Sequence, residues 1–298
     1  MSDWLQVSAV VAPDSADTAE CALIDAGALS VTFMDAGDSP VLEPAAGTTP
    51  LWPRLVVTGL FAPSADALGV LARLAGALPA AQWRLAPLAD REWEREWLKD
   101  FRPMRFGTRL WVAPRALDAP EGSVVVRLEP GLAFGTGTHP TTALCLEWLE
   151  GLPLDGATVL DYGCGSGILA IAAARLGAAR VVAVDNDPQA LQATERNAAS
   201  NDVAEIVTAC MPAQLDTTMR GACADVLVAN ILAGPLAELA PRFAQLVRGG
   251  GRMALSGILL GQEAPVGAAC APWFALDAPV AREDWVRLQG IRKECPAT

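Results

Sequence analysis

Leu160-Asp161-Tyr162-Gly163-Cys164-Gly165-Ser166-Gly167 is the stretch that decides the fold of this chain. A β-branched and apolar run at 157–160 leads into it, and an apolar helical pattern follows at 168–176. Glycine lacks a Cβ and reaches positive φ, so its backbone can be approached closely by a ligand. A strand, three alternating glycines and a helix therefore predict an α/β domain with a nucleoside cofactor beside the turn.

The glycine spacing separates two classes of cofactor. A dinucleotide-binding fold places its glycines as GxGxxG. Here the third glycine comes one residue early, and Asp161 precedes the first glycine by two residues. This DxGxGxG pattern resembles the first motif of the class I S-adenosylmethionine methyltransferases, in which Gly163 and Gly165 would line the cofactor. The spacing disfavours an NAD-dependent dehydrogenase.

A second acid stands at the end of the next predicted strand. The apolar run 180–184 ends in Asp185, twenty residues after Gly165. A carboxylate at this place can accept hydrogen bonds from both ribose hydroxyls of an adenosine group. We therefore expect Asp161, Gly163, Gly165 and Asp185 to bind the cofactor.

Length and composition bound the class of protein. The chain has 298 residues, of which 52% are hydrophobic, so we expect two domains with a sizeable core. It has no apolar run approaching ~18 residues and no basic-then-apolar start, which argues against a membrane span or a secretory signal. We expect a cytoplasmic protein, and a monomer.

Cysteine and histidine usage argues against a metal site. The seven cysteines are scattered, odd in number and never spaced as CxxC, and His139 is the single histidine. A zinc cluster or a disulfide framework therefore has no support, and we expect most cysteines to be small apolar core residues.

The formal net charge of −12 disfavours direct binding of nucleic acid, because phosphates call for basic patches. The acidic surface has two interpretations. It can simply keep the protein soluble, or it can attract a basic macromolecule by long-range steering.

The amino-terminal part predicts a small domain of its own. Two strand–helix–strand patterns occur in under ninety residues, which is typical of a split βαβ, ferredoxin-like module at 1–88. Pro63-Ser64 is the expected cap of its second helix. We interpret it as a substrate-recognition domain, with a purely structural appendage as the alternative. The run DREWEREWLKDF places Trp93 and Trp97 one helical turn apart, which predicts a linker helix over 89–101.

The remaining chain, 102–298, predicts the cofactor domain. Strands at 104–112 and 124–128 precede a helix. Thr138 is the expected cap of this helix, Pro140 lies in its first turn, and it continues as an apolar helix over 143–149. Alternating strands and helices then follow. Asp187-Pro188 is the expected cap and first turn of one helix, and a Gly249-Gly250-Gly251 turn precedes a strand at 252–256. This order predicts a Rossmann-like, mostly parallel seven-stranded sheet with helices on both faces.

Polar side chains gather at one edge of this predicted sheet. Ligands of such sheets bind beyond the carboxyl ends of the strands, where Asp161, Asp185 and Asn230 would lie. The threonines at the start of the 143–149 helix, Thr142 among them, would form a second wall for the ligand.

Four segments together carry a resemblance to one family. The runs GLAFGTGTHPTT, LDYGCGSGILAIAA, VVAVDNDPQAL with ERNAASN, and DVLVANILAGPL resemble the ribosomal-protein methyltransferase family PrmA. The likeness is strong over residues 90–298 and one of topology over the first 85. It implies S-adenosylmethionine as the cofactor and the large-subunit ribosomal protein L-eleven as the partner, methylated on lysine side chains and an N-terminal amine.

Asn230-Ile231-Leu232-Ala233 occupies the place where amino-group methyltransferases of this class carry an Asn-Pro-Pro-Tyr-like tetrapeptide. The prolines and the aromatic residue are absent, so planar nitrogens are less suitable acceptors than aliphatic amines. We expect Asn230 to contact the cofactor and to orient the amine. His139 has two interpretations, a catalytic group or, more simply, a loop residue that packs near the cofactor.

Two other functions fit the same motifs. One is a methyltransferase for a small-molecule amine, and the other is a non-catalytic S-adenosylmethionine-binding ribosome-assembly factor. The intact motif residues weigh against the second.

Overall fold

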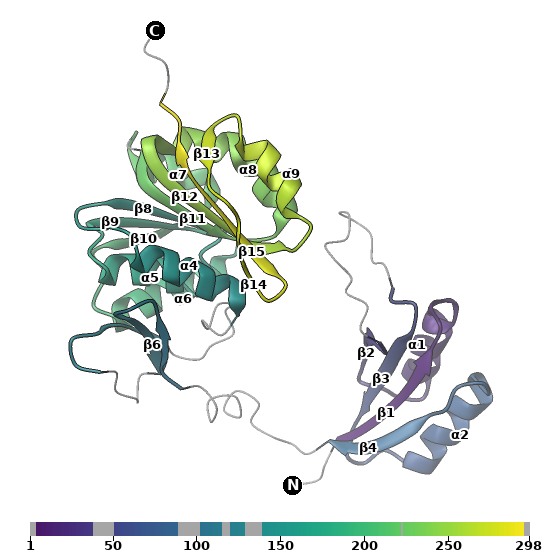
Figure 1. Ribbon diagram of the computed structural model, residues 1–298. Coiled ribbons are helices and arrows are strands. Elements are labelled where there is room, and N and C mark those ends of the chain that lie inside the picture. Colours follow the sequence, from purple (N-terminus) through teal and green to yellow (C-terminus); the bar gives the residue numbers. More distant parts are fainter. Residues whose placement is uncertain are drawn as a thin grey trace. The chain divides into compact units, whose positions relative to one another are not determined.

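The structure, a computed structural model, describes residues 4–37, 51–88, 102–114, 120–128, 139–221 and 223–294 (Figure 1). The chain divides into two compact units, Met1–Glu96 and Trp97–Thr298. The predicted linker helix at 89–101 lies outside the described residues.

The amino-terminal unit has the element order β-α-β-β-α-β. Its elements are β1 (Trp4–Val11), α1 (Ala16–Asp25), β2 (Ser30–Asp35), β3 (Leu55–Phe61), α2 (Ala67–Ala77) and β4 (Arg84–Leu88). The four strands form an antiparallel sheet in the order β2-β3-β1-β4, and both helices cover the same face of it (Figure 1). Leu23, Phe61 and Leu74 are fully buried between the helices and the sheet. The ferredoxin-like assignment of this unit stays a prediction.

One boundary in this unit differs from the prediction. The sequence places the cap of the second helix at Pro63-Ser64, but the helix starts after Asp66. Residues 62–65 instead close a turn, in which the Ala65 backbone N–H donates to the Ala62 carbonyl at 3.0 Å. Proline followed by serine fits a turn as well as a cap, so local sequence does not separate the two.

The second unit is built on a mostly parallel sheet, as predicted. Seven strands lie side by side in the order β10-β9-β8-β11-β12-β15-β13, and an eighth, β14, pairs with β15. The strands are β8 (Thr158–Tyr162), β9 (Arg180–Val184), β10 (Val207–Cys210), β11 (Ala224–Asn230), β12 (Val247–Leu259), β13 (Phe274–Leu276), β14 (Val280–Arg282) and β15 (Trp285–Arg292). The strands from β8 to β12 run parallel, and β15 runs antiparallel to its neighbours. The three-residue β14 is too short to leave a sequence pattern.

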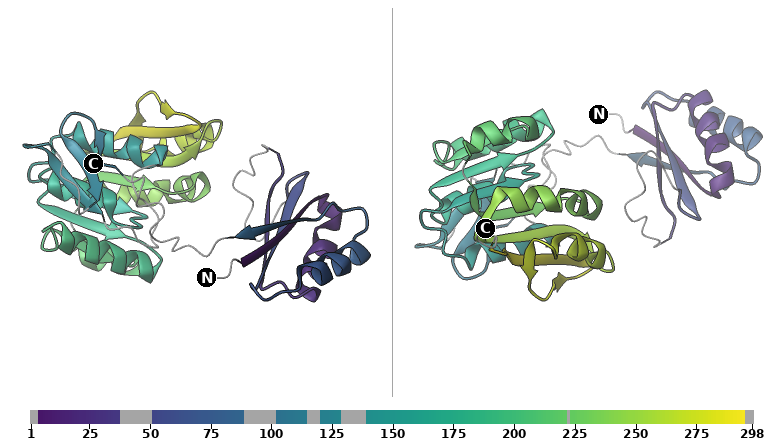
Figure 2. Two further views of the ribbon diagram at one scale, coloured as in Figure 1. Left: turned by 90° about the horizontal axis from the view of Figure 1, so that it is seen from below. Right: turned by 90° about the horizontal axis from the view of Figure 1, so that it is seen from above.

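Helices cover both faces of this sheet (Figure 2). One face carries α4 (Pro140–Glu150), α5 (Ile168–Arg175) and α6 (Pro188–Ser200), and the other carries α7 (Leu215–Met219), α8 (Ala233–Leu246) and α9 (Glu263–Cys270). Successive side chains of a strand point to opposite faces, so Val159 packs with the first group and Leu160 with the second. Four of the seven cysteines are buried, as expected for small core residues: Cys145, Cys164, Cys210 and Cys270.

Two predicted strands have different limits. The expected strand at 104–112 is a hairpin of β5 (Met104–Phe106) and β6 (Leu110–Pro114), and β6 also pairs with β7 (Val124–Leu128). Residues 107–109 form its turn, and Gly107 has a positive φ of 67°. The three glycines at 249–251 lie within the limits of β12 but do not pair with β11, because the ladder passes from Val247 directly to Arg252. Gly250 has a positive φ of 72°, so the expected turn is a bulge in the strand, which resumes its pairing at Arg252 as predicted.

None of the helices in the described part of the chain combines the length and the apolar character needed to cross a bilayer.

Candidate active site

The order in which the chain adds strands to the sheet of the second unit reverses between β8 and β11. From β8 the chain proceeds to β9 and then β10 on one side, and it returns to β11 on the other side. In an open α/β sheet, the crevice outside the carboxyl ends of the strands at such a point is where ligands bind. The carboxyl ends of β8 and β11 carry Asp161-Tyr162 and Asn230, so the structure brings predicted site residues to this point.

The glycine turn follows β8 directly. Gly163, Gly165 and Gly167 have φ values of 82°, 54° and 79°. The Gly163 N–H donates to the Val184 carbonyl at 2.7 Å, which holds the turn against the end of β9. A Cβ on Gly163 would overlap Ile231 Cγ2, so both the φ value and the close approach require glycine there.

Asp185 holds the middle of this turn. Its Oδ2 accepts a hydrogen bond from the Gly165 backbone N–H at 2.9 Å, and its Oδ1 accepts one from the Asp187 N–H at 3.0 Å. A carboxylate has about four lone-pair sites, so each oxygen keeps one for a ligand. The predicted pair Gly165 and Asp185 is therefore joined in the structure, and Asp185 remains only half-buried.

Asp161 lies beneath the turn and is fully buried. Its Oδ2 accepts a hydrogen bond from the Ala170 backbone N–H in the first turn of α5, at 3.0 Å. Burial raises the pKa of Asp161 to about 7, the Ala170 hydrogen bond lowers it, and the Asp185 charge raises it further. Its Oδ1 has no hydrogen-bond partner in the described part of the chain. Asp161 thus supports the turn, and its contact with a ligand stays a prediction.

Thr142 and Asn230 meet although they are 88 residues apart. The Asn230 Nδ2 donates to the Thr142 Oγ1 at 3.3 Å. Thr142 is buried in the first turn of α4, and Asn230 is half-buried at the end of β11. Because the amide nitrogen faces Thr142, the Asn230 Oδ1 is left to accept a hydrogen bond from another group.

His139 is the N-cap of α4. Its Nδ1 lies 2.7 Å from the Thr141 Oγ1, and its ring packs edge-on against Trp285 with 4.8 Å between centroids. These contacts agree with the interpretation of a packed loop histidine. Thr138, the predicted cap, lies outside the described residues.

Helix α6 supplies two residues that the sequence analysis missed. Thr194 is fully buried, and its Oγ1 donates to the Gly165 carbonyl at 3.1 Å. Asn197, one turn later, donates through Nδ2 to the Ser166 carbonyl at 2.8 Å. Both side chains hold the glycine turn in place through its carbonyl groups. The signal was present, because polar residues three apart interrupt the alanine-rich inner face of a helix.

The described groups fit an adenosine-type cofactor. The turn offers glycine main chain at positive φ, Asp185 offers free lone pairs, and a buried Asp161 oxygen lacks a partner in the described part of the chain. Within the described ranges, no cluster of three or more His, Cys, Asp or Glu side chains is arranged to hold a metal ion.

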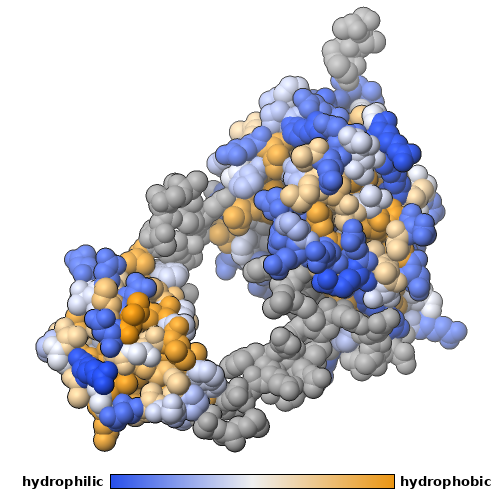
Figure 3. Space-filling view, turned by 180° about the vertical axis from the view of Figure 1, so that it is seen from behind, coloured by the Kyte–Doolittle hydropathy of each residue, from blue (hydrophilic) through white to orange (hydrophobic). Residues whose placement is uncertain are grey.

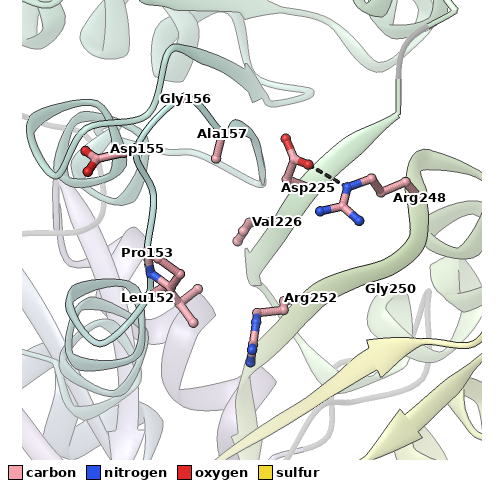
Figure 4. A pocket seen from close by; sticks show the side chains of 10 residues that line it. All are labelled: Leu152, Pro153, Asp155, Gly156, Ala157, Asp225, Val226, Arg248, Gly250 and Arg252. Carbon is pink, nitrogen blue, oxygen red and sulfur yellow. Dashed lines mark hydrogen bonds and ion pairs between the residues drawn. The ribbon is translucent and has the colours of Figure 1, made fainter.

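A pocket also lies at the opposite, amino-terminal edge of the sheet (Figure 4). Two of its charged residues, Asp225 and Arg248, serve the fold. Asp225 accepts a hydrogen bond from the Thr158 N–H at 2.8 Å and pairs with the Arg248 Nε at 2.5 Å, which ties the starts of β8 and β11 to β12. Because ligands of such sheets bind at the other edge, we do not assign the active site here.

Comparison with known proteins gives one consistent result. The family model described as "Ribosomal protein L11 methyltransferase (PrmA)" matches residues 3–293. A protein of that name from Pseudomonas aeruginosa (strain LESB58) is 53% identical over 97% of this chain and 99% of its own length. One from Azotobacter vinelandii (strain DJ / ATCC BAA-1303) is 52% identical over the same shares. The crystal structure of a ribosomal protein L11 methylase from Lactobacillus delbrueckii subsp. bulgaricus is 33% identical, with a TM-score of 0.59 over 65% of this chain and 100% of that one.

Proposed function

Because the chain belongs to the ribosomal protein L11 methyltransferase family, PrmA, we propose that it transfers methyl groups from S-adenosylmethionine to amino groups of L11. The acceptors are lysine side chains and the N-terminal α-amine. The observation that carries the proposal is the Thr142–Asn230 pair at 3.3 Å, placed at the switch point beside the glycine turn. It supplies an amide oxygen for an amine next to a turn suited to the cofactor.

The residues that would hold S-adenosylmethionine surround the turn. Asp185 binds the ribose hydroxyls, and Gly163 and Gly165 let the cofactor approach the main chain closely. The remaining contacts with the cofactor come from Thr142, Asp161 and Asn230. The cofactor supplies a methyl group bonded to a positively charged sulfur. Positioning of the acceptor nitrogen in line with this bond then provides much of the rate.

The protein must also deliver an amine with a free lone pair. Lysine has a pKa of about 10.4 and an α-amine one of about 7.7–8.0, so both are largely protonated at neutral pH. Burial beside a positive sulfur lowers the pKa of the amine through desolvation and like charge, so no dedicated base is needed. Asn230 Oδ1 accepts a hydrogen bond from the amine and thereby directs its lone pair.

Asn230→Ala tests this role. With purified L11 and labelled S-adenosylmethionine, we expect methyl transfer to fall more than tenfold, with a smaller change in the cofactor Kd. Thr142→Val removes the hydroxyl that orients the amide and should give a smaller loss. Near-normal turnover of Asn230→Ala would remove Asn230 from the mechanism. Transfer of label to small amines but not to L11 would favour a small-molecule methyltransferase instead.

We further propose that the amino-terminal unit recognises L11 through the open face of its sheet. Its helices cover one face only, and the other carries an apolar row across three strands. Val56 of β3 pairs with Val10 of β1 on one side and with Met34 of β2 on the other. Val10 and Met34 are 49% and 51% exposed, and further apolar side chains lie on the surface of this unit (Figure 3).

A charge placed on that row tests the assignment. Val10→Lys should raise the KM for L11 about tenfold and leave the cofactor Kd unchanged. Leu68→Lys is the matched control, because Leu68 is also apolar and is 79% exposed, but lies on α2 over the other face. An equal effect of both variants, or of neither, would contradict recognition by the open face. A monomeric state and a cytoplasmic location remain predictions.

A further inference from the structure

The residue after Asn230 is held by β12. Asn230 pairs with Ser256 in the parallel ladder, and the Ile231 N–H donates to the Ser256 carbonyl at 3.1 Å. The next residue of β12, Gly257, has a positive φ of 85°. The pairing of β12 with β15 also shifts register between Leu255 and Ile258, so the strand is irregular at this point.

Gly257 leaves room for the Ile231 main chain. A Cβ on Gly257 would overlap the Ile231 carbonyl oxygen and would lie 2.8 Å from the carbonyl carbon and 3.1 Å from the nitrogen. All three atoms belong to the backbone, so no rotation of a side chain relieves the contact. Even alanine at position 257 would therefore push residues 230–231 away from β12.

Ile231 is enclosed from the opposite direction as well. Its Cγ2 occupies the space that a Cβ on Gly163 would take. Gly163 lies in the turn after β8, and Gly257 lies in β12. These two glycines together enclose Ile231, the residue that follows Asn230. The position of the Asn230 amide relative to the cofactor turn depends on both.

We propose that Gly257 is a positioning residue for methyl transfer, which sets the Asn230 amide through the main chain of Ile231. The proposal rests on the function assigned to Asn230 above. Gly257 has no side chain that could contact the substrate, and its effect comes from the absence of a Cβ atom.

Gly257→Ala tests the proposal, with Gly261→Ala as the matched control. Gly261 lies in the turn after β12 and has a positive φ of 94°, but a Cβ there meets nothing within 4 Å. Both variants carry the strain of alanine at positive φ, and only the first adds the contact with Ile231. We expect kcat to fall at least tenfold for Gly257→Ala, with the KM for L11 and the cofactor Kd within threefold of the parent. Gly261→Ala should keep kcat within twofold.

Two outcomes would overturn the proposal. One is a kcat of Gly257→Ala within twofold of that of Gly261→Ala, and the other is a loss of cofactor affinity as large as the loss of turnover. If Gly257→Ala does not fold, Ile231→Gly releases the same main chain without adding atoms at 257, and it should lower kcat to a similar extent. Its failure to do so would equally refute the idea.

Asn230→Ala measured in parallel separates this inference from the proposed function. If that variant turns over normally, the role of Asn230 is wrong whatever Gly257 does. If it loses turnover while Gly257→Ala and Ile231→Gly keep theirs, only the positioning role is wrong.

Discussion

Replacement of Asp185 by alanine should weaken binding of S-adenosylmethionine by roughly 30- to 150-fold. Asp185 accepts one backbone hydrogen bond on each oxygen, from Gly165 and Asp187, and keeps one lone pair on each for a ribose hydroxyl. Hydrogen bonds to a charged group contribute about 1.5–3 kcal/mol each. Because Asp185 is only half-buried, we take about 1–1.5 kcal/mol for each bond, at or just below the lower end of this range. Two ribose bonds then give about 2–3 kcal/mol, which corresponds to that change in Kd.

Calorimetric titration with the cofactor measures this effect, and Asp187→Ala is its control. Asp187 lies two residues away and caps α6, where its Oδ1 accepts from the Gln189 N–H at 2.8 Å. Loss of the cap costs about 1 kcal/mol of stability but removes no group assigned to the ribose. We expect a lower Tm and a Kd within threefold for this variant. A Kd for Asp185→Ala that also stays within threefold would refute the reasoning.

Three further predictions follow from buried residues. Burial raises the pKa of Asp161 from 3.8 to about 7. Between these pH values the folded protein holds a proton that the unfolded chain releases. The free energy of unfolding therefore falls with rising pH, by about 1.4 kcal/mol per pH unit. Asp161→Asn should flatten this slope in urea titrations from pH 5 to about 7, and equal slopes would contradict the burial. Thr194→Val removes the hydroxyl that donates to the Gly165 carbonyl. The loss of about 1 kcal/mol should raise the cofactor Kd about fivefold. An unchanged Kd in calorimetry would show that the glycine turn does not need this hydrogen bond. Leu74→Ala should destabilise the amino-terminal unit by about 2–5 kcal/mol in denaturant titration, because Leu74 is fully buried in that unit's own core. The cofactor Kd should stay unchanged, and a weakened Kd would contradict the assignment of the cofactor site to the second unit.

The sequence by itself determined the elements that local patterns encode. The glycine turn, the buried helix after it and the strand that ends at Asp185 all follow from hydrophobic periodicity and from residues next to one another in the chain. The cap at Asp187-Pro188 is equally local, because its side chain and the N–H that it accepts from are two residues apart. Where one short sequence fits two conformations, as at 62–65, the pattern alone gave the wrong helix boundary.

Only the tertiary structure decided how these elements meet. The contact of Thr142 with Asn230, the complete burial of Asp161 and the enclosure of Ile231 by Gly163 and Gly257 join residues that are distant in the chain. Hydrophobic periodicity in the sequence does not predict such contacts. They depend on which strands become neighbours and on how many residues each strand contains before it ends. The acids and glycines could therefore be named from the sequence, while the position of Asn230 relative to them required the packed sheet.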